Sequence, residues 1–140
     1  MSNSLKAKAL AYLSRREYTF LELFNKLKRY SDSDSEIKDV LTELVKHGYL
    51  SEERYIKSYL HSKSHKNGLL KIKYNLIQKT ANPQLVEQII SEVAIDEEQV
   101  AKELLAKKFA KVATTTEEKA KQSRFLQSKG FSFSVIRRVI

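Results

Sequence analysis

The fold can be read from residues 27–41, LKRYSDSDSEIKDVL, where a leucine is followed, after a polar break, by three apolar residues. Counted from Leu27, these apolar side chains stand at +10, +13 and +14, which is the spacing of one face of a helix. The serines and aspartates between them are typical of a turn. This stretch therefore predicts the end of one helix, a short turn, and a second helix with an apolar face.

The same pattern occurs twice more without a gap, 49 and then 50 residues further on. The three sets are Leu27 with Ile37, Val40 and Leu41; Leu76 with Val86, Ile89 and Ile90; and Leu126 with Ile136, Val139 and Ile140. A fixed period of this length indicates an internal repeat. We therefore predict an all-α fold of three tandem three-helix modules (residues 1–50, 51–95 and 96–140) that stack into an elongated, curved array. One compact bundle of nine helices is the alternative.

Local signals predict where several helices begin and end. Thr19 with Glu22 three residues later forms a capping box. Ser51 and Asp96 are expected to be N-caps, and Asn82-Pro83 is an N-cap followed by proline at the first helical position. Gly48 fits the left-handed position after a helix.

The apolar spacing also gives expectations that depend on packing. It places Tyr30 on the apolar face of the helix after Thr19, and it places a later helix over 119–129 after a loop at 113–116. Val45 and Val93 are expected on buried stripes. The aromatic residues expected in the core are Tyr12, Phe20, Phe24, Tyr30, Tyr55 and Tyr59.

Composition excludes several classes of protein. There is no cysteine, so disulfides, zinc–thiolate sites and iron–sulfur clusters are excluded. Three glycines and one proline are too few for most all-β folds or phosphate-cradling loops. No apolar run approaches the roughly 20 residues that span a bilayer, and no signal-peptide core is visible. We expect a cytoplasmic protein without a membrane partner.

The charge favours a polyanionic partner. Lys and Arg number 26 against 17 Asp and Glu, a formal net charge of +9. Residues 54–86 and 119–140 contain basic residues and no acidic one, whereas 31–36 is acidic and is not expected to face DNA. The predicted partner- and DNA-binding residues are Arg54, Lys57, Lys63, Lys66, Lys71, Lys73, Arg124, Lys129, Arg137 and Arg138.

No residues suggest catalysis. His61 and His65 have a spacing that could hold a metal, but no carboxylate lies between Glu53 and Glu87 to complete a site, so they are interpreted as surface residues. The pairs Glu97-Glu98 and Glu117-Glu118 fall at predicted helix starts, where the helix dipole favours negative charge. We predict no catalytic residue, metal or cofactor, and hence a protein that is not an enzyme.

Three stretches together resemble the RecX family of recombination regulators. They are ALAYLSRREYTFLELFNKL (9–27); LTELVKHGYLSEERY (41–55), which continues to Ser62-Lys63 and Asn67-Gly68; and RFLQSKGFSFSVI (124–136). They are similar to that family's opening, central and closing motifs, and their order is the same. The resemblance covers nearly the whole chain.

This resemblance implies tandem three-helix modules and a regulatory function. Proteins of this kind bind the RecA filament on single-stranded DNA, lie in its helical groove, and suppress its ATPase, strand-exchange and coprotease activities. Weak electrostatic binding to single-stranded DNA would follow from the charge, and nothing suggests more than a monomer. The alternative is a sequence-independent DNA-binding protein that uses its basic helical modules directly.

Overall fold

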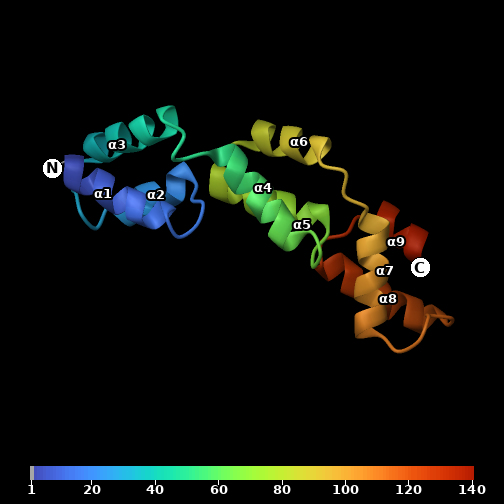
Figure 1. Cartoon of the computed structure of the whole chain (residues 1–140). Coiled ribbons are helices and arrows are strands. Elements are labelled where there is room, and N and C mark those ends of the chain that lie inside the picture. The colour runs from blue at the N-terminus through green and yellow to red at the C-terminus, as the bar shows by residue number, and fades with distance from the viewer. Residues whose placement is uncertain (1) are drawn as a thin grey trace. The chain divides into compact units, whose positions relative to one another are not determined.

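Helices account for all the regular structure in residues 2–140, the part of the chain that the computed structural model describes (Figure 1). No strand occurs among these residues, so the predicted all-α class is confirmed. The nine helices of this described part are α1 (Ser2–Leu13), α2 (Phe20–Leu27), α3 (Asp34–Lys46), α4 (Glu52–Lys63), α5 (Leu69–Thr80), α6 (Pro83–Glu92), α7 (Glu97–Lys108), α8 (Thr116–Ser128) and α9 (Phe133–Val139).

Contacts divide the chain into two units. The N-terminal unit comprises the residues up to Ser58 together with Leu76–Ile89. The C-terminal unit comprises Tyr59–Asn75 together with Ile90–Ile140. The middle repeat contributes to both units, so the predicted module boundaries at residues 50 and 95 stay a prediction about the repeat in the sequence.

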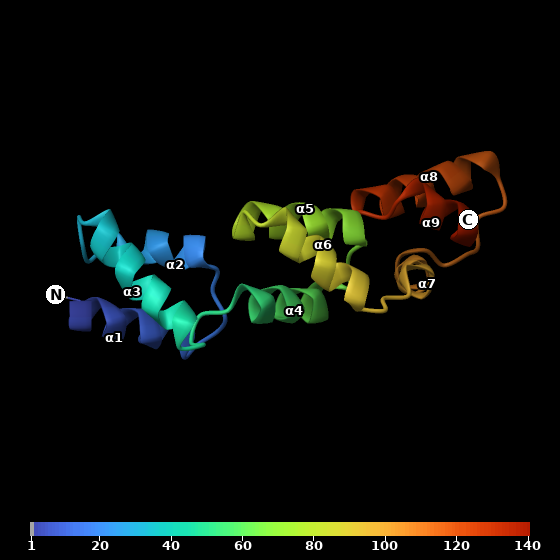
Figure 2. The ribbon, with the colours of Figure 1, turned by 90° about the horizontal axis from the view of Figure 1, so that it is seen from above.

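The core of the N-terminal unit lies between α1, α2 and α3, which Figures 1 and 2 both show side by side. Each helix turns its apolar face inward, because burying apolar surface is what stabilises an amphipathic helix in a small domain. The buried residues of this core are Leu5, Ala9, Tyr18, Leu23, Leu27, Ile37, Val40, Leu41, Leu44 and Leu50.

The C-terminal unit has a second core of the same kind. Here α7, α8 and α9 pack on one another, and α9 contacts both of the other helices. The buried residues of this core are Ala101, Leu126, Phe131, Val135 and Ile136.

The repeat is visible in the burial pattern. Leu27, Leu76 and Leu126, which define its period, are all fully buried. Ten residues after each, Ile37, Val86 and Ile136 are buried as well. The interpretation of the sequence as tandem three-helix repeats is therefore confirmed.

The predicted caps are confirmed too. Thr19 and Glu22 form the capping box, with 3.0 Å from the Glu22 N–H to Thr19 Oγ1 and 3.0 Å from the Thr19 N–H to Glu22 Oε1. Ser51, Asn82 and Asp96 accept from the N–H groups of Arg54, Leu85 and Gln99 over 3.1–3.2 Å. Gly48 has φ +80, the left-handed conformation expected after α3.

Four packing expectations were wrong. Helix α2 ends at Leu27, and the Tyr30 N–H then bonds the Leu27 carbonyl in a tighter turn, which leaves the Tyr30 ring 44 % exposed. Val45 and Val93 are exposed at 47 % and 37 %. Helix α8 begins at Thr116 rather than 119, because Thr115 and Glu118 form a second capping box that turns the expected loop into a helix start.

Candidate nucleic-acid interface

The predicted basic residues of the C-terminal unit lie on several different elements. Lys63 ends α4 and Lys66 follows it, Lys71 and Lys73 are on α5, and Arg124 is on α8 with Lys129 as that helix's C-cap. Arg137 and Arg138 are on α9. Lys73 and Lys129 are half-buried and the others are exposed.

The start of α5 meets the end of α8 in a joint made of backbone. The Gly68 N–H donates to the Lys129 carbonyl over 2.8 Å, and the Leu70 N–H donates to the Gly130 carbonyl over 3.2 Å. The Leu69 N–H donates to Glu97 Oε2 over 2.9 Å. The N–H groups that a helix start leaves unpaired are thus satisfied by a distant segment rather than by a local side chain.

Two glycines make this joint possible. A Cβ on Gly68 would collide with the carbonyl and carbonyl carbon of Gly130. Gly130 has φ +92, and a Cβ there would collide with Lys71. Their contact joins residues 62 positions apart, so it left no local signal in the sequence.

The joint brings the two basic stretches together. Lys71, from the stretch at 54–86, lies against Gly130, which follows Lys129 of the stretch at 119–140. No ion pair joins either lysine to a carboxylate in the portion described. Lysines that extend from one joint without a compensating acid attract a polyanion, and the attraction falls as salt increases.

Arg54 has a different environment. Its Nε bonds Glu17 Oε2 over 3.0 Å, and its Nη2 donates to the carbonyls of Gly48 over 2.7 Å and Tyr49 over 3.2 Å. These contacts tie α4 to the turn before α2 and to the turn after α3. Lys57, one turn later on α4, pairs with Glu53 over 2.9 Å. Both residues belong to the N-terminal unit, whereas the α5–α8 joint belongs to the C-terminal unit.

On α9 the two arginines differ. Arg138 Nη1 bonds Glu98 Oε1 over 3.2 Å, which links α9 to the start of α7, and both side chains stay largely exposed. Glu98 thus belongs to a helix start, as its position in the sequence predicted. Arg137 is exposed on the same helix.

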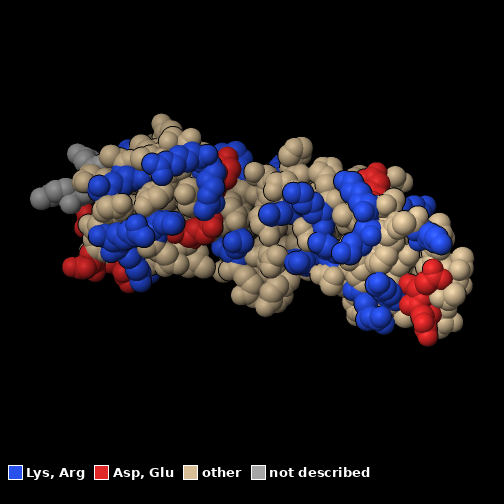
Figure 3. All heavy atoms as spheres, turned by 90° about the horizontal axis from the view of Figure 1, so that it is seen from below, with Lys and Arg blue, Asp and Glu red and all other residues tan. Residues whose placement is uncertain are grey.

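Sequence reasoning missed a third set of basic residues, in the N-terminal unit. Figure 3 shows Lys and Arg atoms spread widely over the face of α1 and α2, with Asp and Glu mainly toward its margins. The acids Glu17 and Glu22 interrupt the run in the sequence, which hid it from a search for stretches without acids. Its members are Lys6, Lys8, Arg15, Arg16, Lys26, Lys28 and Arg29.

Other candidate chemistry was also located. The rings of His61 and His65 meet edge to face, with centroids 6.4 Å apart. Across residues 2–140, no three His, Asp or Glu side chains gather as metal ligands, and no helix has both the length and the apolar character needed to cross a bilayer.

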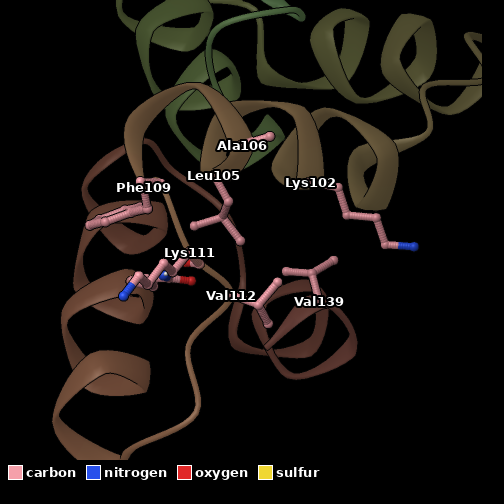
Figure 4. A pocket seen from close by; sticks show the side chains of 9 residues that line it. Lys102, Leu105, Ala106, Phe109, Lys111, Val112 and Val139 are labelled. Carbon is pink, nitrogen blue, oxygen red and sulfur yellow. Dashed lines mark hydrogen bonds between the residues drawn. The ribbon is translucent and has the colours of Figure 1, made fainter.

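A pocket of about 310 Å³ opens between α7, α9 and the segment that follows α7 (Figure 4). Leu105, Val112 and Val139 point toward its centre, whereas the ammonium groups of Lys102 and Lys111 lie at its margin. Its lining holds no carboxylate and no imidazole, and therefore no pair of these groups that could act in general acid–base catalysis.

Comparison with known protein families gives a consistent result. Residues 96–140 match the family model described as RecX, third three-helix domain. The regulatory protein RecX of Leptothrix cholodnii is 35 % identical over 137 residues, which covers 98 % of this chain and 87 % of the relative. The regulatory protein RecX of Herbaspirillum seropedicae is 36 % identical over 134 residues, covering 96 % and 87 %.

Solved structures agree on the fold. The crystal structure of RecX from Lactobacillus salivarius superposes with a TM-score of 0.85 at 21 % identity, over 99 % of this chain and 93 % of that one. A second crystal structure, of a regulatory protein RecX, also gives 0.85, at 22 % identity, over 99 % and 72 %.

Proposed function

Because the chain belongs to the RecX family of regulatory proteins, we propose that it binds the RecA filament on single-stranded DNA and lies as a monomer in the filament's helical groove. In this role it suppresses ATP hydrolysis, strand exchange and coprotease activity without catalysing a reaction itself. Its place of action is the cytoplasm, in recombination and DNA repair.

The observation that carries the proposal is the convergence of the two basic stretches at the α5–α8 joint. Lys71 and Lys129 come from different helices, and the backbone contacts of Gly68 and Gly130 bring their backbones to one joint. Basic residues anchored at one joint suit a surface whose negative charges are held in place, such as a strand within a protein filament. Lys63, Lys66, Arg124 and Arg137 extend the same charge and are proposed as further contacts.

Arg54, Lys57 and Arg138 are weaker candidates, because each already has a carboxylate partner. A side chain that leaves an ion pair to bind a filament must exchange one partner for another, so its net contribution is smaller. We propose that their first role is to hold helices together.

The test is single-stranded-DNA-dependent ATP hydrolysis by RecA, titrated with this protein. Inhibition well below one molecule per RecA protomer, at concentrations that leave free DNA unsaturated, is expected. A parallel measurement of DNA binding without RecA provides the control. If ATP hydrolysis falls only as the protein coats the DNA, the alternative, a sequence-independent DNA-binding protein, is the better description.

A pair of charge-matched variants locates the surface. Lys71→Glu with Lys129→Glu is expected to raise the concentration needed for half inhibition at least tenfold, an estimate of about 1.4 kcal/mol for two lost charge contacts. Lys38→Glu with Lys46→Glu on α3 changes the net charge equally, and both of those side chains are exposed. Equal losses in the two variants would show that net charge alone matters, and circular dichroism checks that both remain helical.

A further inference from the structure

A small pocket on the N-terminal unit is lined by hydrogen-bond donors. It measures about 200 Å³ and is formed by Lys8, Ala11, Tyr12 and Arg15 with Tyr30. This volume lies below the roughly 300 Å³ at which pockets for drug-sized ligands begin. It suits a group the size of a phosphate together with some water, and it is too small for a whole nucleotide.

The two phenols of the pocket affect each other's pKa through a hydrogen bond between them. This bond, followed by burial, raises the pKa of Tyr12. The same bond, followed by the nearby charges of Lys8 and Arg29 and a bond from Arg29, lowers the pKa of Tyr30, although burial opposes this. A bond between two phenols uses one O–H hydrogen, so the other O–H of the pair remains to be donated.

The cations beside these phenols lack carboxylate partners. Lys8 Nζ lies 4.3 Å from the centroid of the Tyr30 ring, and Arg15 also lines the pocket. Among residues 2–140 neither cation makes an ion pair. Their neighbours do, since Lys6 pairs with Glu43 over 3.0 Å and Arg16 with Glu22 over 3.5 Å.

An ammonium, a guanidinium and a phenol O–H thus border one small space whose lining holds no carboxylate. Phosphate oxygens complement such a set, because they accept several charge-assisted hydrogen bonds at once and a guanidinium can bind two of them. The uncompensated positive charge of the pocket favours an anion there.

We propose that Lys8, Arg15 and Tyr30 form a phosphate-binding site, whose ligand is a backbone phosphate of single-stranded nucleic acid. The site lies outside the basic stretches at 54–86 and 119–140. It adds a direct contact made by residues of α1, the turn after α1 and the turn after α2. It rests on the proposed function only for the choice of nucleic acid as the source of the phosphate, and its test needs no RecA.

The first measurement is the affinity of the full chain for a fluorescently labelled oligothymidylate, by anisotropy at several salt concentrations. Tyr30→Phe keeps the ring beside Lys8 and removes only the O–H, and it is expected to weaken binding about three- to tenfold, as for one hydrogen bond. Tyr12→Phe is the matched control, because Tyr12 lines the same pocket but is not one of the three proposed contacts. It is expected to change affinity less than twofold.

The salt dependence of binding distinguishes a direct contact with a phosphate from a general electrostatic attraction to the nucleic acid. Lys8→Gln and Arg15→Gln are each expected to lower the slope of log K against log salt by about 0.7, the value for one phosphate contact on a single strand. Lys38→Gln on α3 removes an exposed charge away from the pocket and is expected to leave the slope unchanged. The site is refuted if Lys38→Gln acts like Lys8→Gln, or if Tyr30→Phe binds like the unaltered protein.

A second measurement identifies the source of the phosphate. The ring signals of Tyr12 and Tyr30 are followed by NMR as inorganic phosphate or the oligonucleotide is added. Shifts with the oligonucleotide that Lys8→Gln abolishes support the proposal, whereas shifts with inorganic phosphate alone, or with neither, overturn it. If the phosphate site is refuted but the protein still inhibits RecA, the proposed function stands without this site. If the protein does not inhibit RecA but the oligonucleotide still binds at the pocket, the phosphate site stands without the proposed function.

Discussion

Glu52 accepts a hydrogen bond from the backbone N–H of Phe20 over 3.0 Å, and its second carboxylate oxygen is buried without a partner. The first residue of α4 thus caps the first residue of α2, 32 positions earlier. Glu97, the first residue of α7, makes the corresponding contact with Leu69 at the start of α5. A carboxylate that begins one repeat therefore caps the second helix of the repeat before it, once in each unit.

This contact predicts a pH dependence. Burial raises the pKa of Glu52 above its usual 4.5, the charge of Glu22 adds to this, and the Phe20 N–H opposes it. A raised carboxyl pKa means that the folded state binds the proton more tightly, so this contribution to stability is present below pH 4.5 and is lost as pH rises through the folded pKa.

We expect Glu52→Gln, which retains an acceptor for the Phe20 N–H, to gain stability relative to the unaltered protein over that pH interval. The measurement is the free energy of urea unfolding at several values between about pH 4 and pH 7. Taking the difference between the two proteins cancels the titration of other groups. A difference that does not change with pH would contradict the assignment.

Arg54 is predicted to stabilise the folded protein. Arg54→Lys keeps the charge beside Glu17 but cannot also donate to the two carbonyls that the guanidinium reaches. We expect a loss of about 1 kcal/mol in the free energy of unfolding, as for one net hydrogen bond. Lys57→Gln, one turn further on the same helix, removes an exposed ion pair with Glu53 and is expected to cost less than about 0.5 kcal/mol. Equal costs would show that the carbonyl contacts contribute nothing.

The capping box of α2 gives a third prediction. Thr19 is fully buried, and it exchanges two hydrogen bonds with Glu22 at a helix of only eight residues. Thr19→Ala is expected to lower the free energy of unfolding by about 1 kcal/mol. Thr42→Ala, at an exposed position within α3, is the control and is expected to be neutral or slightly stabilising. Thermal unfolding of both variants checks this, and a stable Thr19→Ala variant would mean that the cap is redundant.

The sequence predicted those features that depend on neighbouring residues. Caps at Thr19, Ser51 and Asp96 involve partners three positions away, and the repeat involves spacings within one turn-and-helix pair, so both were visible without coordinates. Tyr30 was misplaced, because apolar spacing alone does not show that a helix of eight residues has already ended.

The sequence did not predict the contacts between repeats. Arg54 and Glu17 are 37 positions apart, and nothing in either segment identifies the other as its partner. Glu97 was expected only to favour its own helix start, whereas it also caps α5. The basic residues of α1 and α2 were overlooked for a related reason: their acids are engaged in caps and ion pairs, and only the folded chain shows which cations remain uncompensated.

The last prediction links the α5–α8 joint to function. Gly68→Ala places a methyl group against the backbone of Gly130, where no flexible side chain can move aside, so the two helices must separate. We expect a loss of about 1–3 kcal/mol in stability, the usual cost of overpacking. Because Lys71 and Lys129 would no longer be held together, inhibition of RecA is expected to weaken even though the net charge is unchanged.

Gly48→Ala is the matched control for this variant. Gly48 has φ +80 and open space around its Cβ position, so alanine there costs backbone strain of about 1–2 kcal/mol but disturbs no joint. At a temperature where both variants remain folded by circular dichroism, Gly48→Ala is expected to inhibit ATP hydrolysis normally, and Gly68→Ala to need a severalfold higher concentration. Equal inhibition by the two would show that stability, and not the spacing of Lys71 and Lys129, governs the activity.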